Sequence, residues 1–223
     1  MQNKKYRIDY TQKIEEFGRT LYRIVALADF GNVATGDQGG YIESESNLSQ
    51  YGNAWVYDNA RVYGNAKVYG NARVYDNAKV YDNARVYGNA IVYDNAEVYD
   101  NAKVYDNARV YYNAKVYDKA IVYDNAKVYD NAEVYGNVRV CDNAIVYYNA
   151  KVAKHCITVR TSKYYCTITD TRMAIGCRNY TFSEWENLTE QEIRKMDTDA
   201  WEWWTQWKPI LFEILKVENK VKT

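Results

Sequence analysis

From Tyr51 to Val152 the chain consists of six-residue repeats without an insertion or a deletion. The seventeen hexads read close to Tyr-Asp-Asn-Ala-Arg-Val or Tyr-Gly-Asn-Ala-Lys-Val, and the high tyrosine content, 25 residues, follows largely from them. A fixed period of this kind is typical of a solenoid, in which each unit buries its apolar face only against its neighbours. The repeat therefore restricts this half of the chain to a stack of small, nearly identical units.

Within a hexad, a small residue and a valine stand two apart with a charged residue between them, as in Ala60-Arg61-Val62. Since side chains alternate along a strand, alanine and valine should face inward and the charge outward. The Tyr-Asp-Asn or Tyr-Gly-Asn segment should form the corner, because these residues tolerate turn dihedrals. We therefore expect a mainly β fold, a three-sided parallel β-helix with 18 residues per coil, a dry core and a height of roughly 27 Å.

Segments such as Val-Tyr-Asp-Asn-Ala-Arg resemble the bacterial hexapeptide-repeat proteins, although a tyrosine follows each valine where that family usually has a small residue. The resemblance implies a left-handed helix; a right-handed three-sided helix is the alternative. Residues 20–24, residues 36–44 and the tail from Ile175 through Trp203-Trp204 are similar to uncharacterised phage and prophage proteins that carry the same repeat. That similarity implies a viral or mobile-element source and no particular activity.

The open strand edges at both ends of a solenoid need caps. We expect residues 1–39 to form the N-terminal cap, with a strand over 21–27, and residues 40–163 to form the β-helix, with Ile42 and Leu48 in the register of Ala54. Residues 164–223 should form a C-terminal cap. It should contain a hairpin with its tip at Thr171-Arg172, a helix opened by the capping box Thr189 to Glu192, and a second helix kinked or restarted at Pro209.

Two apolar surfaces are candidate contact sites for a protein partner or a second copy of the chain. The first is the tryptophan-rich C-terminal segment, which we expect either to cap the last coil or to form a subunit interface. The second is a strip of outward residues at intervals that are multiples of eighteen. The candidate residues are Trp185, Trp201, Trp203, Trp204 and Trp207 in the first surface, and Trp55, Ile91 and Ile145 in the second.

Few residues point to catalysis, to a metal or to a cofactor. Transferases of the hexapeptide family use a histidine beside a loop that leaves a coil, but the coils here are unbroken and the one histidine, His155, should fill a corner. A zinc site of His155, Cys156, Cys166 and Cys177 lacks the short paired spacing of structural sites. We expect Cys166 and Cys177 to face each other across the hairpin as thiols, and the stacked Asp106, Asp124 and Asp142 to be solvated rather than to bind calcium.

Charge and hydropathy limit the partners and the cellular compartment that the sequence suggests. Basic and acidic residues balance, 29 against 29, so a nucleic-acid partner is disfavoured, and no apolar run suggests a signal peptide or a membrane span. We therefore expect a protein of the bacterial host cytoplasm without a cofactor. The leading hypothesis is a non-catalytic scaffold that binds a host protein or itself, as a dimer or trimer, with a host-defence antagonist as one form of it. The alternatives are an acyltransferase-like enzyme with His155 as its base, and a nucleic-acid or nucleotide binder that uses stacked tyrosines.

Overall fold

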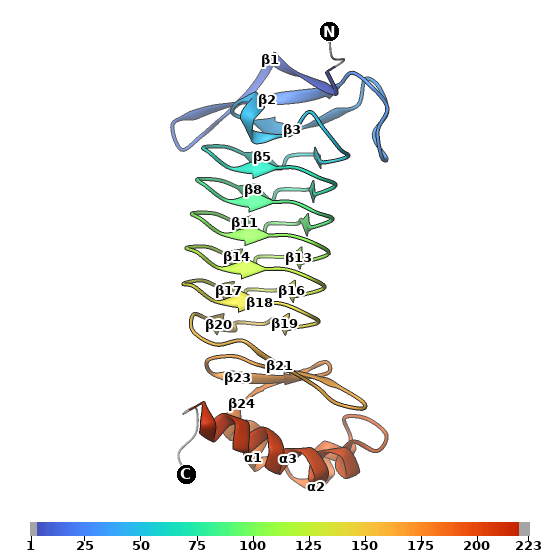
Figure 1. The fold of residues 1–223 in the computed structure, drawn as a ribbon, viewed down its shortest axis with the longest axis vertical. Helices are drawn as coiled ribbons and strands as arrows, with labels where there is room; N and C mark the ends of the chain where they lie inside the picture. Colours follow the sequence, from blue (N-terminus) through green and yellow to red (C-terminus); the bar gives the residue numbers. More distant parts are fainter. Residues whose placement is uncertain (1–3, 219–223) are drawn as a thin grey trace.

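The computed structural model describes residues 4–218, which form a column with a cap at each end (Figure 1). The three-sided parallel solenoid with 18 residues per coil is confirmed. Its strands have two residues each and recur every six residues: β4 (Trp55–Val56), β5 (Arg61–Val62), β6 (Lys67–Val68), β7 (Arg73–Val74), β8 (Lys79–Val80), β9 (Arg85–Val86), β10 (Ile91–Val92), β11 (Glu97–Val98), β12 (Lys103–Val104), β13 (Arg109–Val110), β14 (Lys115–Val116), β15 (Ile121–Val122), β16 (Lys127–Val128), β17 (Glu133–Val134), β18 (Arg139–Val140), β19 (Ile145–Val146) and β20 (Lys151–Val152).

Three parallel sheets form the sides of the column. One runs β5-β8-β11-β14-β17-β20, the second β4-β7-β10-β13-β16-β19 and the third β6-β9-β12-β15-β18. The alanines and valines of the repeat face inward and are buried in one continuous core, as the two-residue alternation predicts. No space remains between such small side chains, so the column is a packed rod.

Most backbone hydrogen bonds between successive coils run from an N–H group to a carbonyl one coil further along the chain, as from Arg61 to Ala78 (2.9 Å) and from Lys103 to Ala120 (3.0 Å). The parallel pairing of the valines, as of Val62 with Val80, adds bonds in the opposite direction. The N-terminal end of the column therefore presents mainly carbonyl groups without a donor, and the C-terminal end mainly N–H groups without an acceptor. Because buried backbone groups need partners, the two caps must supply mainly opposite kinds of group.

The second residue of each corner adopts a left-handed backbone conformation. Glycine or aspartate stands at most of these positions, for example Gly88 (φ 68°) and Asp106 (φ 56°). An aspartate there also accepts the N–H of the equivalent residue one coil further along, as Asp76 does from Asp94 (3.2 Å). The corner consensus is thus explained by the left-handed turn, which glycine and aspartate accept at the least cost.

The N-terminal cap is an antiparallel sheet of β1 (Tyr6–Glu16), β2 (Arg19–Ala26) and β3 (Gln38–Ile42), and β3 continues in parallel onto β5. Gly39 lets β3 approach the first coil, because a Cβ there would lie 2.6 Å from the carbonyl oxygen of Val56. Two side chains supply donors to the open carbonyls: the Lys5 ammonium bonds Gly52 and Ala54 (3.3 and 2.8 Å), and the Asn47 amide bonds Gly64 and Ala66 (both 3.0 Å).

The expected register of the first coil is wrong. Ile42 pairs with Val62 and Leu48 with Val68, so both take the valine position rather than the alanine position of Ala54. The offset is twenty residues instead of eighteen, because Leu48 and Val56 are eight residues apart rather than six, whereas Ile42 and Leu48, which flank the 3-10 turn η1 (Glu45–Asn47), keep the spacing of six. The turn places Asn47 where its side chain, rather than its backbone, bonds the next coil.

A fourth, antiparallel sheet covers the C-terminal end of the column: β21 (Ile157–Arg160), β22 (Tyr165–Ile168), β23 (Arg172–Ile175) and β24 (Arg178–Thr181). One of its faces carries the small, buried Thr167, Thr169, Ala174 and Asn179. Thr167 accepts the N–H of Ile145 (3.0 Å), and the Asp170 carboxylate accepts the N–H groups of residues 153, 154 and 155 (2.6 to 3.1 Å). This end of the column thus receives acceptors, as its free N–H groups require.

The other face of this sheet is apolar and packs against α1 (Phe182–Asn187), α2 (Glu190–Arg194) and α3 (Ala200–Val217). Thr189 caps α2 as predicted, its hydroxyl accepting from the N–H of Glu192. Pro209 lies inside α3 and does not start a new helix. The tryptophan-rich segment therefore does not cap the last coil, which was one of the two expectations, because the sheet lies between them (Figure 1). None of the helices in the described range could cross a membrane.

The hairpin exists, but its predicted register is wrong by two residues. Cys166 pairs with Ile175, and residues 169–172 form the turn, closed by the N–H of Thr169 donating to the carbonyl of Arg172 (2.9 Å). Cys166 points into the apolar core below the sheet, whereas Cys177 is exposed in the next turn. The two cysteines therefore do not face each other, and both are free thiols.

Candidate functional site

The tryptophans predicted to contact a partner lie mostly inside the C-terminal unit (residues 157–218). Trp185 and Trp204 are each 2% exposed and Trp203 is buried as well, so the expectation that these three present an open contact face is wrong. They fill the core between the sheet and the helices, where the indole N–H of Trp185 donates to the carbonyl of Met173 (2.6 Å). Trp201 and Trp207 are half-buried at the edge of the same core.

The predicted apolar strip along the column is not continuous. Trp55 is 1% exposed, because the rings of Tyr6 and Phe30 in the N-terminal cap pack edge-on against it at 6.0 and 5.3 Å. Ile91 and Ile145 are half-buried on the same sheet, but Arg109 and Lys127 lie between them. Strand alternation placed Trp55 outward correctly, yet it could not show that the cap folds over it.

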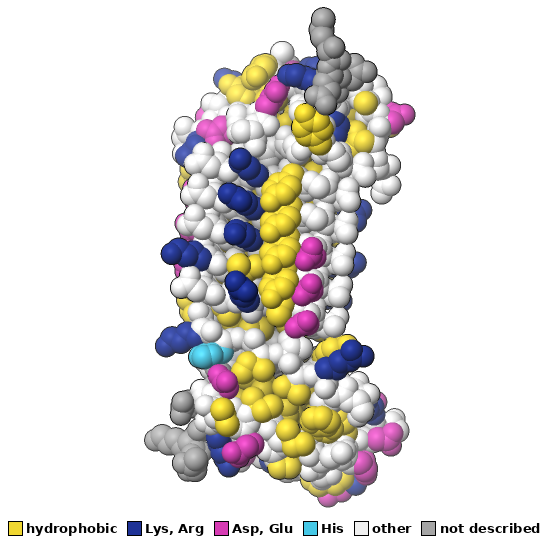
Figure 2. Space-filling model, in the orientation of Figure 1, with side chains coloured by type: hydrophobic (Ala, Val, Ile, Leu, Met, Phe, Trp, Pro, Cys, Tyr) yellow, Lys and Arg dark blue, Asp and Glu magenta, His cyan; other side chains and the backbone are white. Residues whose placement is uncertain are grey.

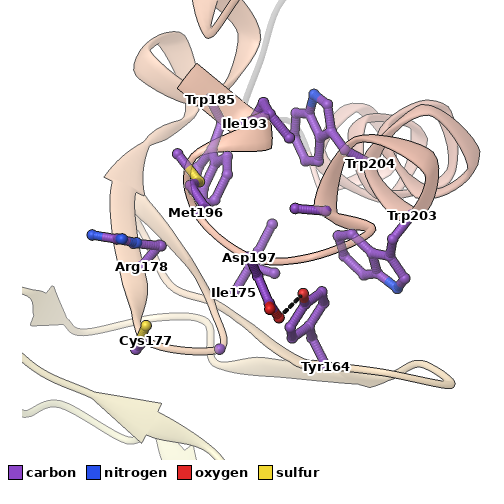
Figure 3. Close-up of a pocket in the computed structure, with 12 residues that line it drawn as sticks. Tyr164, Ile175, Cys177, Arg178, Trp185, Ile193, Met196, Asp197, Trp203 and Trp204 are labelled. Carbon is purple, nitrogen blue, oxygen red and sulfur yellow. Dashed lines mark hydrogen bonds between the residues drawn. The ribbon is translucent and has the colours of Figure 1, made fainter. Parts of the chain in front are cut away.

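A cavity opens where the helices meet the C-terminal sheet, and we call it the aromatic chamber (Figure 3). Its volume is about 150 Å³ and its walls are largely apolar. The rings of Trp185 and Trp204 lie 5.1 Å apart, and those of Tyr164 and Trp203 meet edge-on at 4.9 Å. Its lining residues include Tyr164, Trp185, Ile193, Met196, Trp203 and Trp204.

Two charged residues of opposite sign stand at the rim of the aromatic chamber. Asp197 accepts the hydroxyl proton of Tyr164 (2.5 Å) and lies 3.4 Å from the Lys163 ammonium, and the bond from Tyr164 lowers the pKa of its carboxyl. Arg178 is exposed, and its guanidinium has no ion pair or hydrogen bond within residues 4–218. The Asp197 carboxylate is therefore already paired within the protein, whereas the Arg178 guanidinium is available to bind an anionic group.

A second hollow, of about 270 Å³, adjoins the chamber, and we call it the arginine hollow. The two share Cys177 and Arg178 in their walls. Arg172 lies in the arginine hollow as well, but its guanidinium donates to the carbonyl of Asn179 (3.0 Å) and faces Glu184 at 3.9 Å. Tyr148 forms part of the wall on the side of the column. Arg178 is thus the one basic group of these walls without a partner in the described structure.

Two exposed tyrosines on the column depart from the corner consensus. Tyr112 and Tyr148 occupy the left-handed position, each with φ 57°, and are 51% and 56% exposed. They belong to one corner column, with Asp130 between them. A bulky residue in this conformation costs energy, and strain of this kind concentrates at functional sites. Sequence reasoning missed both, although Tyr-Tyr-Asn in place of Tyr-Asp-Asn was a readable signal.

The first tyrosines of the corners stack into three ladders, with successive ring centroids 4.7 to 5.1 Å apart. Burial raises the pKa of many of their hydroxyls, to about 12 for Tyr99 and Tyr129. Figure 2 shows hydrophobic side chains in a continuous column flanked by basic and acidic ones. Most inner rings have a stacked neighbour on both faces, although no stacking is found between Tyr75 and Tyr93 in the described structure. At the stacked rings a nucleobase could insert only by opening the coil spacing.

The remaining candidate residues are dispersed. His155 lies beyond the last coil, 44% exposed, with its Nδ1 3.3 Å from a carboxylate oxygen of Glu218. In the described part of the chain, the one close group of potential metal ligands is Asp124, Cys141 and Asp142. The zinc set considered from the sequence, His155 with Cys156, Cys166 and Cys177, is therefore not brought together. Paired strands from β4 to β20 are always 18 residues apart, so no loop leaves a coil there.

The comparisons with known proteins bear on the repeat alone. A family model described as the YdcK beta solenoid repeat matches residues 66–82 and 78–94, which are two overlapping stretches of the column. No curated protein matches the chain. Together with the coil geometry, the match identifies the chain as a β-solenoid repeat protein.

Proposed function

We propose that the chain is a non-catalytic scaffold that binds another protein through one surface at the C-terminal end of the column. This contact surface comprises Tyr112 and Tyr148 on the corner, the arginine hollow and the mouth of the aromatic chamber. Its residue types, exposed tyrosines, tryptophan, methionine and arginine, are those enriched at the cores of protein interfaces. The rigid column then acts as a spacer that carries the surface.

The observation that carries this proposal is the strained backbone at Tyr112 and Tyr148. Aspartate or glycine would fit both positions with less strain, as it does at most equivalent corners. A stability cost that the rest of the repeat avoids is best explained by a role for the exposed rings. In the described structure the aromatic contacts of their rings are with the neighbouring ladder tyrosines, at 5.1 Å in each case, which gives little stabilisation in return.

The finer parts of the proposal rest on sequence resemblance. We propose a left-handed hexapeptide-type helix, a phage or prophage source, and a partner in the cytoplasm of the bacterial host, with host-defence antagonism as one specific form. Self-association into a dimer or trimer is the alternative use of the same surface. Analytical ultracentrifugation separates the two, since a monomer at micromolar concentration removes self-association from consideration.

The proposal is tested by capture from a bacterial lysate, mass spectrometry, and calorimetric titration of the identified partner. The double variant Tyr112→Asn, Tyr148→Asn keeps the left-handed corners at a lower backbone cost and should weaken binding at least tenfold. Tyr10→Asn is the matched control, because Tyr10 is 67% exposed on the opposite cap. Unchanged affinity of the double variant would reject the contact surface.

A further inference from the structure

We propose that the aromatic chamber receives one aromatic or large aliphatic side chain of the partner protein, and that Arg178 pairs with an acidic residue next to it. This inference rests on the proposed function and specifies the partner's chemistry. The partner segment would thus carry an apolar anchor followed or preceded by aspartate or glutamate.

The volume of the chamber sets the size of the anchor. An apolar cavity of about 150 Å³ accommodates a benzene-sized ring, whereas pockets for drug-sized ligands begin at about 300 Å³. Single anchor side chains that fill such pockets dominate the energetics of many protein interfaces. Three indole rings and Met196 surround the space, and a ring entering it would replace solvent by apolar contacts (Figure 3).

The charged groups at the rim of the chamber determine which charge is favoured on the partner residue next to the anchor. A cationic side chain would have to compete with Lys163 and Tyr164 for Asp197, which already accepts from Tyr164 and lies 3.4 Å from the Lys163 ammonium. An anionic side chain meets Arg178, whose guanidinium has no partner among the residues that the structure describes and which stands in the wall between the chamber and the arginine hollow. Guanidinium groups bind carboxylates through paired hydrogen bonds, so an acid is favoured over a base.

The test uses short probes on the whole chain, followed through the indole N–H resonances in ¹H–¹⁵N spectra. Acetyl-Phe-Glu-amide should bind with a millimolar dissociation constant, about fivefold more tightly than acetyl-Phe-Lys-amide. Acetyl-Ala-Glu-amide should not shift the indole signals. Phenylacetate tests for a small aromatic acid: if it bound more than tenfold more tightly than the glutamate probe, the site would belong to a small molecule and the inference would fail.

Two variants separate the parts of the inference. Ala200→Met fills the chamber from its wall while adding apolar contact, so it should abolish binding of both phenylalanine probes without lowering the unfolding midpoint. Arg178→Glu should reverse the preference between the glutamate and lysine probes. Arg160→Glu is its control, because Arg160 is an exposed basic residue of the same sheet outside both hollows.

The outcomes for the probes and for partner capture are independent. Absence of indole shifts with every phenylalanine probe would overturn the inference, and capture that still depends on Tyr112 and Tyr148 would leave the proposed function standing. An unchanged preference in Arg178→Glu would overturn the assignment of the acidic neighbour. Probe binding without capture of any protein would instead reject the proposed function.

Discussion

Tyr112 offers a direct measure of the strain at the contact surface. Replacing it by aspartate restores the repeat consensus at a position with φ 57°. The left-handed conformation costs an ordinary residue about 1 to 2 kcal/mol, and aspartate less because its side chain can bond locally. About 1 kcal/mol should therefore be recovered from the backbone alone.

Two further contacts change with this substitution. The new carboxylate can accept the N–H of Asp130, as Asp94 accepts that of Tyr112 (3.0 Å), which adds about 0.5 to 1 kcal/mol for an exposed bond. The lost ring contact with Tyr111, at 5.1 Å, removes about 0.5 kcal/mol. Tyr112→Asp should thus raise the free energy of unfolding by about 1 to 1.5 kcal/mol. Tyr148→Asp should gain only about 0.5 kcal/mol, because no coil follows it to donate a bond.

Urea unfolding followed by far-ultraviolet circular dichroism measures these differences. The reverse change, Asp130→Tyr, lies between the two tyrosines in the same corner column and should cost about 1 to 2 kcal/mol, since it introduces strain and removes the acceptor for Tyr148 (3.1 Å). A loss of stability in Tyr112→Asp would refute the reasoning, because it would mean that the ring contributes more than the strained backbone costs.

Three more predictions concern the column ends and the ladders. Asp170→Ala should lower the free energy of unfolding by about 3 kcal/mol, since three N–H groups lose a charged acceptor, and Asp170→Asn by less; equal urea midpoints for alanine and wild type would contradict this. Lys5→Met should cost about 2 to 3 kcal/mol in the same titration, because the carbonyls of Gly52 and Ala54 keep their burial and lose their donor, whereas Tyr10→Asn at the same cap should be near neutral. Raising the pH from about 10 to about 12 should destabilise the fold: the unfolded tyrosine pKa is about 10, burial raises the pKa of Tyr99 and Tyr129 to about 12, and only the unfolded chain therefore releases these protons in that window. The urea midpoint should therefore fall as the pH rises through this range, and an unchanged midpoint would count against the ladders as a protected stack.

The sequence was sufficient to predict the column, because every hexad has the same alternation of inward and outward residues. Ala102 and Val104 face inward for the reason that Ala60 and Val62 do, and one register fixes all the others. The errors occur where the repeat stops. Cys166 pairs with Ile175 instead of facing Cys177, because the turn that places Asp170 over the last coil sets the hairpin register.

The candidate site was less predictable, because the exposure of its residues depends on packing between segments that are distant in the sequence. Trp55 was correctly assigned to its strand, whereas α1, which carries Trp185, was not predicted, and the burial of both side chains comes from segments distant in the sequence. The aromatic chamber is likewise created by packing between a sheet and three helices. Tyr112 and Tyr148 were accessible to sequence reasoning, since each breaks a consensus whose physical basis is a left-handed corner.

Every coil bonds the next one through the same set of groups, so the number of coils can change while the two ends of the column stay the same. Deleting residues 73–90 removes one coil and joins Ala72 to Ile91, so that β4 would stack on β10 with the same inward side chains. At the N-terminal end, Lys5 and Asn47 still bond the carbonyls they bond now, and at the C-terminal end Asp170 still accepts the N–H groups of residues 153, 154 and 155. The variant should therefore fold with its caps intact and lose stability only in proportion to one coil. Partner affinity should stay within twofold if the contact surface alone binds; a tenfold loss would show that the partner also reaches the N-terminal cap, about 4.8 Å nearer after the deletion.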